Sequence, residues 1–171
     1  MDIKARWELS EDERHTTSLN VQRSEREIER LCEFNEVWAS LYIWHDSDPE
    51  NISELLRINP DEVSRKGDPL TPEGRWDVRS RRTCWILSSE GKIEQDSIEA
   101  HLNWILAQVS GSLPNLRGLQ DSGARTKIVI HLNSWSRFQH VELNVETLLL
   151  LARYRLSLTI NVHYQNTEAE Y

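Results

Sequence analysis

Apolar and polar residues alternate through residues 37–45, which is the pattern of a β-strand. Small and aliphatic side chains fall on one side of this stretch. The other side carries the rings of Trp38, Tyr42 and Trp44. Both sides are therefore rich in apolar surface, and the alternation predicts a strand with an aliphatic face and an aromatic face.

Three stretches carry the spacing of amphipathic helices. The first follows Asp48, which precedes a proline suited to the first helical position, and it should end ahead of Pro60. The second and clearest follows Asp96, with Glu99 three residues later in the capping-box arrangement. The third follows Asn144, whose side chain can cap the helix. These signals predict three helices separated by extended segments.

Alternation returns in three further regions, and each predicts one or more strands. In the last of them, alternate residues from Leu156 to Tyr164 should point into the core. Residues 61–74 hold enough proline and glycine to mark an exposed connection, and residues 113–123 suggest one short helical turn. The first region fits either two strands or one long bent strand. The three regions are residues 76–89, 126–135 and 156–164.

The order of elements predicts an α+β fold. Alternation with a polar outer side favours a mostly antiparallel sheet of four or five strands, with helices on one face. The result is a two-layer sandwich of ferredoxin-like character, with a helix and a strand added at the C-terminus. We expect a single domain over residues 35–165. A charged N-terminal arm, partly helical or flexible, precedes it at residues 1–34, and a polar tail follows at residues 166–171.

Charge changes this picture by narrowing the class of partner. The 171 residues include 28 acidic and 20 basic side chains, for a formal net charge of -8. This excess repels phosphate backbones and attracts basic proteins, so we expect a protein partner and no nucleic acid. No apolar run is long enough to cross a membrane, no signal peptide is evident, and Cys32 and Cys84 belong to no C-x-x-C pair. These features predict a cytoplasmic protein with reduced thiols and no membrane contact.

The polar side of the predicted sheet is the first candidate binding site. Aromatic rings beside amides and imidazoles make a good contact surface for a protein or a flat ligand. The alternative is that the N-terminal arm or the proline-rich loop covers these rings. The candidate residues are Trp38, Tyr42, Trp44, His131, Trp135, Asn161 and His163.

A cluster of arginines is the second candidate, because guanidinium groups can bind a phosphate or a carboxylate. The alternative is pairing with local acids such as Asp77. The cluster consists of Arg75, Arg79, Arg81 and Arg82.

Catalytic and metal-binding signatures are not found in the sequence. Histidines and an aspartate near predicted strand ends lack the close spacing typical of zinc ligands, so we expect no metal and no cofactor. His101 is expected at the boundary of the core. No nucleophile elbow and no phosphate-binding loop occurs, which predicts that the protein is not an enzyme. The residues considered as metal ligands were His45, Asp46, His131, His140 and His163.

Two short segments carry a resemblance to a known family. They are Pro60 with the Lys66-Gly67-Asp68 turn, and the strand Trp85-Ile86-Leu87-Ser88-Ser89. Together with the order of elements over residues 37–164, they resemble the bacterial family called domain of unknown function 4279. The resemblance implies a small bacterial α/β domain, of a kind sometimes found among genes for secreted toxins and their immunity proteins. The family has no established activity and no known functional residues, so the resemblance assigns neither to this sequence.

These observations lead to two main hypotheses, and a hydrolase or metal enzyme is the third and least favoured. The first is a non-catalytic protein-binding domain, most concretely an immunity protein that binds and neutralises a basic toxin. Its basis is the negative net charge, the seven tryptophans and the lack of catalytic and metal-binding signatures in the sequence. The alternative is a small-ligand-binding or regulatory module that uses the aromatic face or the arginines. The sequence leaves open whether the protein is a monomer or a dimer.

Overall fold

The computed structural model describes residues 36–69, 78–95, 97–134 and 141–164. The predicted arm and the predicted tail lie outside these ranges. In chain order the elements are β1 (Glu36–His45), α2 (Pro49–Leu56), β2 (Glu62–Ser64), β3 (Thr83–Ser88), α3 (Ile98–Ser110), α4 (Leu113–Asp121), β4 (Arg125–Ser134), α5 (Val145–Arg153) and β5 (Ser157–Tyr164).

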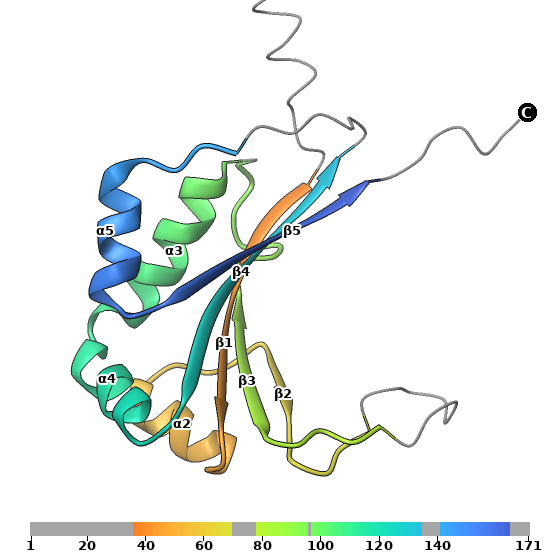
Figure 1. Cartoon of the computed structure of the whole chain (residues 1–171), viewed down its shortest axis with the longest axis vertical. Coiled ribbons are helices and arrows are strands. Elements are labelled where there is room, and N and C mark those ends of the chain that lie inside the picture. Colours follow the sequence, from red (N-terminus) through yellow and green to blue (C-terminus); the bar gives the residue numbers. More distant parts are fainter. Residues whose placement is uncertain (1–35, 70–77, 96, 135–140, 165–171) are drawn as a thin grey trace, which may run out of the picture. The chain divides into compact units, whose positions relative to one another are not determined.

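The five strands form one sheet in the order β2-β3-β1-β4-β5 (Figure 1). β1 pairs antiparallel with β3 and β4, and β2 pairs antiparallel with β3. Only β4 and β5 run parallel, with α5 between them. The first four strands and their helices follow the ferredoxin-like order of elements, and α5 and β5 extend it. The predicted α+β class and the mostly antiparallel sheet are confirmed.

All four described helices lie on the same face of the sheet, as Figure 1 shows. The core forms between this helix layer and the aliphatic sides of the central strands. Leu41 of β1, Trp85 of β3 and Ile130 of β4 are fully buried there, together with Ile52 of α2 and Leu102 of α3. Because β1 is the middle strand, its alternation fixes which side chains of the whole sheet point away from the helices.

The helix ends differ in detail from the sequence predictions. α2 begins at Pro49 as expected, but the Asp48 side chain makes no capping bond. It ends at Leu56 because Arg57 adopts a left-handed conformation, with φ of 57°, and its N–H bonds to the Ser53 carbonyl. The helix therefore stops before the proline that was expected to end it.

The cap of α3 is Ser97, whose side chain accepts from the Ala100 N–H, and not the predicted Asp96. Asp96 itself lies outside the described residues. The Glu99 carboxylate accepts from the backbone N–H of Asn144 at 3.0 Å, which ties the start of α5 to α3. The cap of α5 is confirmed, since Asn144 Oδ1 accepts from the Thr147 N–H at 2.7 Å.

Two elements differ from the sequence reading. The region of exposed connection contains the short edge strand β2, and residues 113–121 form a full helix, α4, instead of one turn. Leu116 and Leu119 are buried on it. In the described part of the region expected to be extended, residues 78–89, the strand is Thr83–Ser88. Before it, a single bridge joins Pro69 to Arg79, and residues 70–77 are outside the described ranges.

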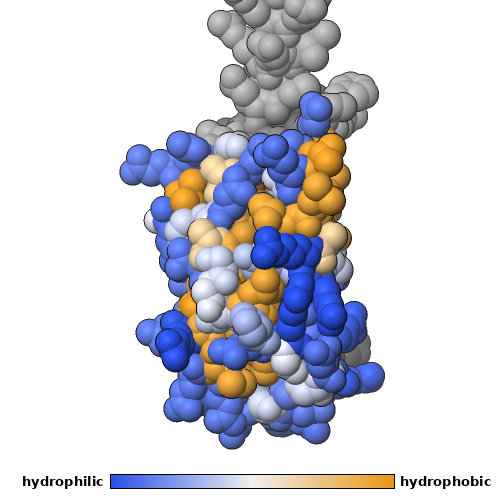
Figure 2. Space-filling view, turned by 90° about the vertical axis from the view of Figure 1, so that its left-hand side faces the viewer, coloured by the Kyte–Doolittle hydropathy of each residue, from blue (hydrophilic) through white to orange (hydrophobic). Residues whose placement is uncertain are grey.

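β5 is less buried than its pattern predicts. Leu156 is buried, but Ile160, Val162 and Tyr164 are 37%, 49% and 43% exposed. The cause is position, because β5 is the edge strand and its C-terminal half extends past α5 (Figure 1). The outer surface of the helix layer also carries apolar patches among charged residues (Figure 2), and Leu149 of α5 is 65% exposed.

Candidate binding surface on the open face of the sheet

The face of the sheet opposite the helices, called the open face below, carries the predicted aromatic site. In the strand register Trp38 pairs with His131, and His131 pairs with Asn161. Period-2 alternation places the rest of the set on the same side of β1 and β5. The structure thus brings together Trp38, Tyr42, Trp44, His131, Asn161 and His163, while Trp135 lies outside the described residues.

Three of these side chains form a stacked row across β1, β4 and β5. The ring centroids of Trp38 and His131 are 4.8 Å apart and their planes differ by 4°. Those of His131 and His163 are 6.4 Å apart, at 3°. Trp38 and His131 are half-buried, whereas His163 is exposed. This ring row, Trp38–His131–His163, is a flat surface on which another ring or a guanidinium group can stack.

The imidazole of His131 is in an unusual environment. Its Nε2 atom is buried and has no hydrogen-bond partner. Burial lowers the pKa of His131 below the ordinary value of 6.5, the nearby His163 lowers it further, and Glu90 opposes both effects. Desolvation disfavours the charged imidazolium, so His131 stays neutral to a lower pH than an exposed histidine does.

This lowered pKa predicts a pH dependence of stability. As the pH falls below about 6.5, the unfolded chain takes up a proton at His131 before the folded protein does. We therefore expect the free energy of unfolding to decline from about pH 6.5 down through the lowered pKa. His131→Gln should flatten this slope in urea titrations between pH 7.5 and 5. An unchanged slope in His131→Gln would show that other groups cause it.

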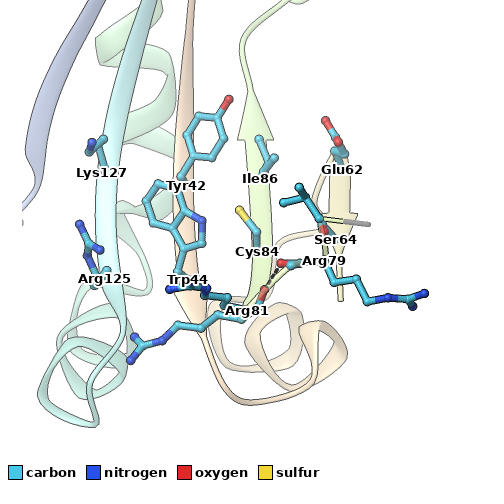
Figure 3. A pocket seen from close by; sticks show the side chains of 13 residues that line it. Tyr42, Trp44, Glu62, Ser64, Arg79, Arg81, Cys84, Ile86, Arg125 and Lys127 are labelled. Carbon is cyan, nitrogen blue, oxygen red and sulfur yellow. Dashed lines mark hydrogen bonds between the residues drawn. The ribbon is translucent and has the colours of Figure 1, made fainter. Parts of the chain in front are cut away.

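The other end of the open face is hollowed. Figure 3 shows this hollow, with the rings of Tyr42 and Trp44 on its floor. Their centroids are 5.3 Å apart, with planes inclined by 14°. The volume is about 580 Å³, which is within the size range of small-molecule sites. We call it the cationic hollow, because its wall includes Arg81, Arg82, Arg125 and Lys127.

The strand register gives the hollow two different sides. On β3, Ile86 lies beside Tyr42 and Cys84 lies beside Trp44, so this side is apolar. On β4, Lys127 lies beside Tyr42 and Arg125 lies beside Trp44, so this side is cationic. A ring on the floor would have aliphatic contacts on one flank and positive charge on the other.

The predicted arginine cluster is only partly in this hollow. Arg81 and Arg82, just before β3, reach its wall, as does Arg79. Arg79 Nη1 also donates to the Gly67 carbonyl at 3.2 Å. Arg75 lies outside the described residues, as does Asp77, the acid suggested as a partner for the cluster.

Sequence reasoning missed Arg125 and Lys127 as site residues. The signal was present, because alternation along residues 126–135 already placed Lys127 on the side opposite the aliphatic residues. What the sequence could not supply was the register, which puts this side of β4 next to Tyr42 and Trp44.

Cys84, on the floor of the hollow, is buried and chemically quiet. Burial, reinforced by the charge of Glu62, raises the pKa of its thiol to about 11. The reactive thiolate is therefore rare at neutral pH. Relative to the ordinary value of 9.0, we expect alkylation by iodoacetamide at pH 7.5 to be about 100-fold slower than in urea. Peptide mass spectrometry measures this ratio, and equal rates in the two conditions would contradict the burial.

A serine and a histidine meet in the core, but they form a structural network. Ser89 Oγ accepts from the Ala39 N–H at 2.9 Å and lies 2.7 Å from His101 Nδ1. His101 Nε2 lies 2.8 Å from the Gln95 carbonyl. With the proton on Nε2, every polar atom of this hydrogen-bonded network has a partner. Ser89 and His101 are 0% and 2% exposed, so no substrate can reach Oγ, and the expectation of a boundary position for His101 was wrong.

The histidines and the aspartate considered as metal ligands form no single group in the part of the chain that the structure covers, although His131 and His163 are neighbours. Within the described ranges, no three His, Cys, Asp or Glu side chains form a group that could hold a metal ion. β1 ends at His45 and Asp46 follows it, while His131 and His163 belong to the ring row, and His140 is outside the ranges.

None of the described helices combines the length and the apolar character that a membrane crossing requires.

Comparison with known proteins gives one match. A family model described as a domain of unknown function (DUF4279) matches residues 33–165, which is well over half of the chain. No curated protein and no solved structure gives a match.

Proposed function

Since the chain belongs to the DUF4279 family, whose description assigns no activity, we propose from the surface that it is a non-catalytic domain that holds a protein partner on its open face. One observation carries this proposal. The described helices all cover the other face, which leaves the rings of Trp38, Tyr42 and Trp44 half-buried on a face that no described helix or strand covers. Half-exposed aromatic side chains of this kind are typical anchors of protein interfaces.

The ring row is the part of the open face best suited to such a partner. Trp38 and His131 are already ordered by stacking, so a partner that packs on them loses little side-chain entropy. Exposed Asn161, next to His131 in the register, offers hydrogen bonds at the rim. An apolar centre with a polar rim is the usual anatomy of an interface.

Acidic groups near the ring row favour a basic partner. Glu36 accepts from Asn133 at 2.7 Å at the end of the strands, and Glu90 is close enough to influence the pKa of His131. The net charge of -8 steers a basic protein toward the molecule from a distance. The most concrete form of the proposal is an immunity protein, acting in the cytoplasm, that binds and neutralises a basic toxin.

Binding rather than catalysis is also favoured by the chemistry of the reactive groups. The Ser89 hydroxyl is sealed in the core with His101. The Cys84 thiol is held in its protonated form by a pKa of about 11. Neither group is available as a nucleophile at neutral pH.

Co-expression with a toxin encoded by an adjacent gene tests this function. We expect a stable complex in size-exclusion chromatography and rescue of growth when the toxin is induced. Glu90→Lys should weaken both because it removes an acid near the ring row. Glu54→Lys, an equal charge reversal at an exposed site on α2, should weaken them less. Absence of both complex and rescue would contradict the immunity function.

A further inference from the structure

We propose that the cationic hollow binds a nucleoside phosphate, with the base on Tyr42 and Trp44 and the phosphate on Arg125 and Lys127. This site is separate from the ring row, and it does not depend on the protein partner proposed above. The register, the cations that form no ion pair among the described residues, and the size of the hollow lead to this ligand class.

The register orders the chemistry across the floor of the hollow. One row reads Glu62 on β2, Ile86 on β3, Tyr42 on β1 and Lys127 on β4. A carboxylate therefore stands at one edge and an ammonium group at the other, with an aliphatic and an aromatic side chain between them. Three interstrand spacings separate the edges by about 14 Å at the backbone.

Each part of a nucleoside phosphate matches one part of this row. A flat base stacks on the aromatic floor, where it also contacts Ile86. The amino group of a base can donate a hydrogen bond to the Glu62 carboxylate. The phosphate is an anion, which belongs beside Lys127 and the neighbouring Arg125.

The cations around the hollow are available to such a ligand. Within the described ranges, no ion pair joins Arg81, Arg82, Arg125 or Lys127 to a carboxylate. Figure 3 shows the Arg81 guanidinium on the same side of Trp44 as Arg125 and Lys127. Like charges gathered on one side of the hollow repel one another, and a bound phosphate reduces this repulsion.

The positive charge around the hollow is opposite in sign to the net charge of the protein, which is -8. General attraction of polyanions is therefore weak, and an anion that binds needs the hollow itself. A base stacked on the floor supplies the additional affinity. The combination favours a mononucleotide or dinucleotide over a long nucleic acid.

Isothermal titration calorimetry and thermal shift on the purified full chain test the proposal. The probes are AMP, ADP and ATP, and we expect at least one to bind with a Kd of about 100 µM or tighter and to raise the Tm. Adenosine supplies the ring without the charge, and pyrophosphate supplies the charge without the ring. Both should bind at least about 10-fold more weakly, because each lacks half of the contacts.

Variants locate the site. The double variant Arg125→Gln/Lys127→Gln should weaken nucleotide binding at least about 10-fold, as should Trp44→Leu. Arg153→Gln, at the exposed end of α5 in the helix layer, removes a charge elsewhere and should leave the Kd within about twofold. Equal losses in Arg153→Gln and in the double variant would overturn the location.

Three results would overturn the ligand class. One is no binding of any nucleotide. Another is pyrophosphate binding as tightly as ADP, which would show a site for simple anions. The third is a single-stranded oligonucleotide or an aromatic carboxylate, such as indole-3-acetate, binding more tightly than every mononucleotide. Because these assays need no toxin, their failure is distinct from a failure of the immunity function.

Discussion

Trp85→Ala is expected to reduce the free energy of unfolding by about 3–5 kcal/mol, the range found when a fully buried large aromatic residue is truncated. Trp85 is 0% exposed on the helix side of β3. Its Nε1 donates to Ser53 Oγ of α2 at 3.0 Å, so the variant loses packing and also leaves the Ser53 hydroxyl without this donor. Urea denaturation monitored by circular dichroism measures the loss.

Trp104→Ala is the matched control for Trp85→Ala. Trp104 on α3 is only half-buried, and the Lys92 ammonium lies over its ring at 4.9 Å from the centroid. Truncation exposes less new surface and leaves no large cavity, so the loss should be less than half as great. Equal losses in the two variants would contradict the placement of Trp85 at the centre of the core.

His101→Ala is expected to reduce the free energy of unfolding by about 2–4 kcal/mol, which is the second-largest effect. The variant removes a buried ring and leaves the Ser89 hydroxyl and the Gln95 carbonyl without their partner. Ser89 also bonds Ala39 through its backbone and its side chain, so the loosened network lies where β1 meets the end of β3. Urea denaturation at pH 7.5 measures the loss.

His163→Ala is the control for His101→Ala, since His163 is exposed on the edge strand. Its replacement should change the free energy of unfolding by about 0.5 kcal/mol or less. His101→Phe separates the two contributions, because it restores volume without the hydrogen bonds. If His101→Phe is as stable as the natural chain, the hydrogen bonds of His101 do not stabilise this part of the core.

Much of the fold is readable from the sequence because the pattern is local. The alternation around Leu41 predicts β1, and Asn144 predicts the start of α5, since each depends on a few neighbouring residues. β2 was missed because three residues carry too little periodicity. The exposure of Val162 was missed for a different reason. Alternation marks a face, but only the edge position of β5 decides whether a helix covers it.

The candidate surfaces were likewise predictable from the sequence only in part. The rings of Trp38 and Tyr42 were predicted to share a face, and they do, because period-2 geometry determines it. The arginines and the aromatic residues were treated as two separate sites. Arg81 and Trp44 line one hollow because β3 pairs with β1, which is a contact between residues about 40 apart in the chain. No local pattern encodes that pairing.

The most direct test of the open face as the binding surface is to measure the Kd of the proposed basic protein partner for the natural chain, Trp38→Ala and Leu149→Ser. Thermal unfolding first confirms that both variants are folded. We predict a loss of at least about 10-fold for Trp38→Ala and less than about twofold for Leu149→Ser in the helix layer. A large loss in Leu149→Ser with unchanged affinity in Trp38→Ala would place the partner on the opposite side of the molecule.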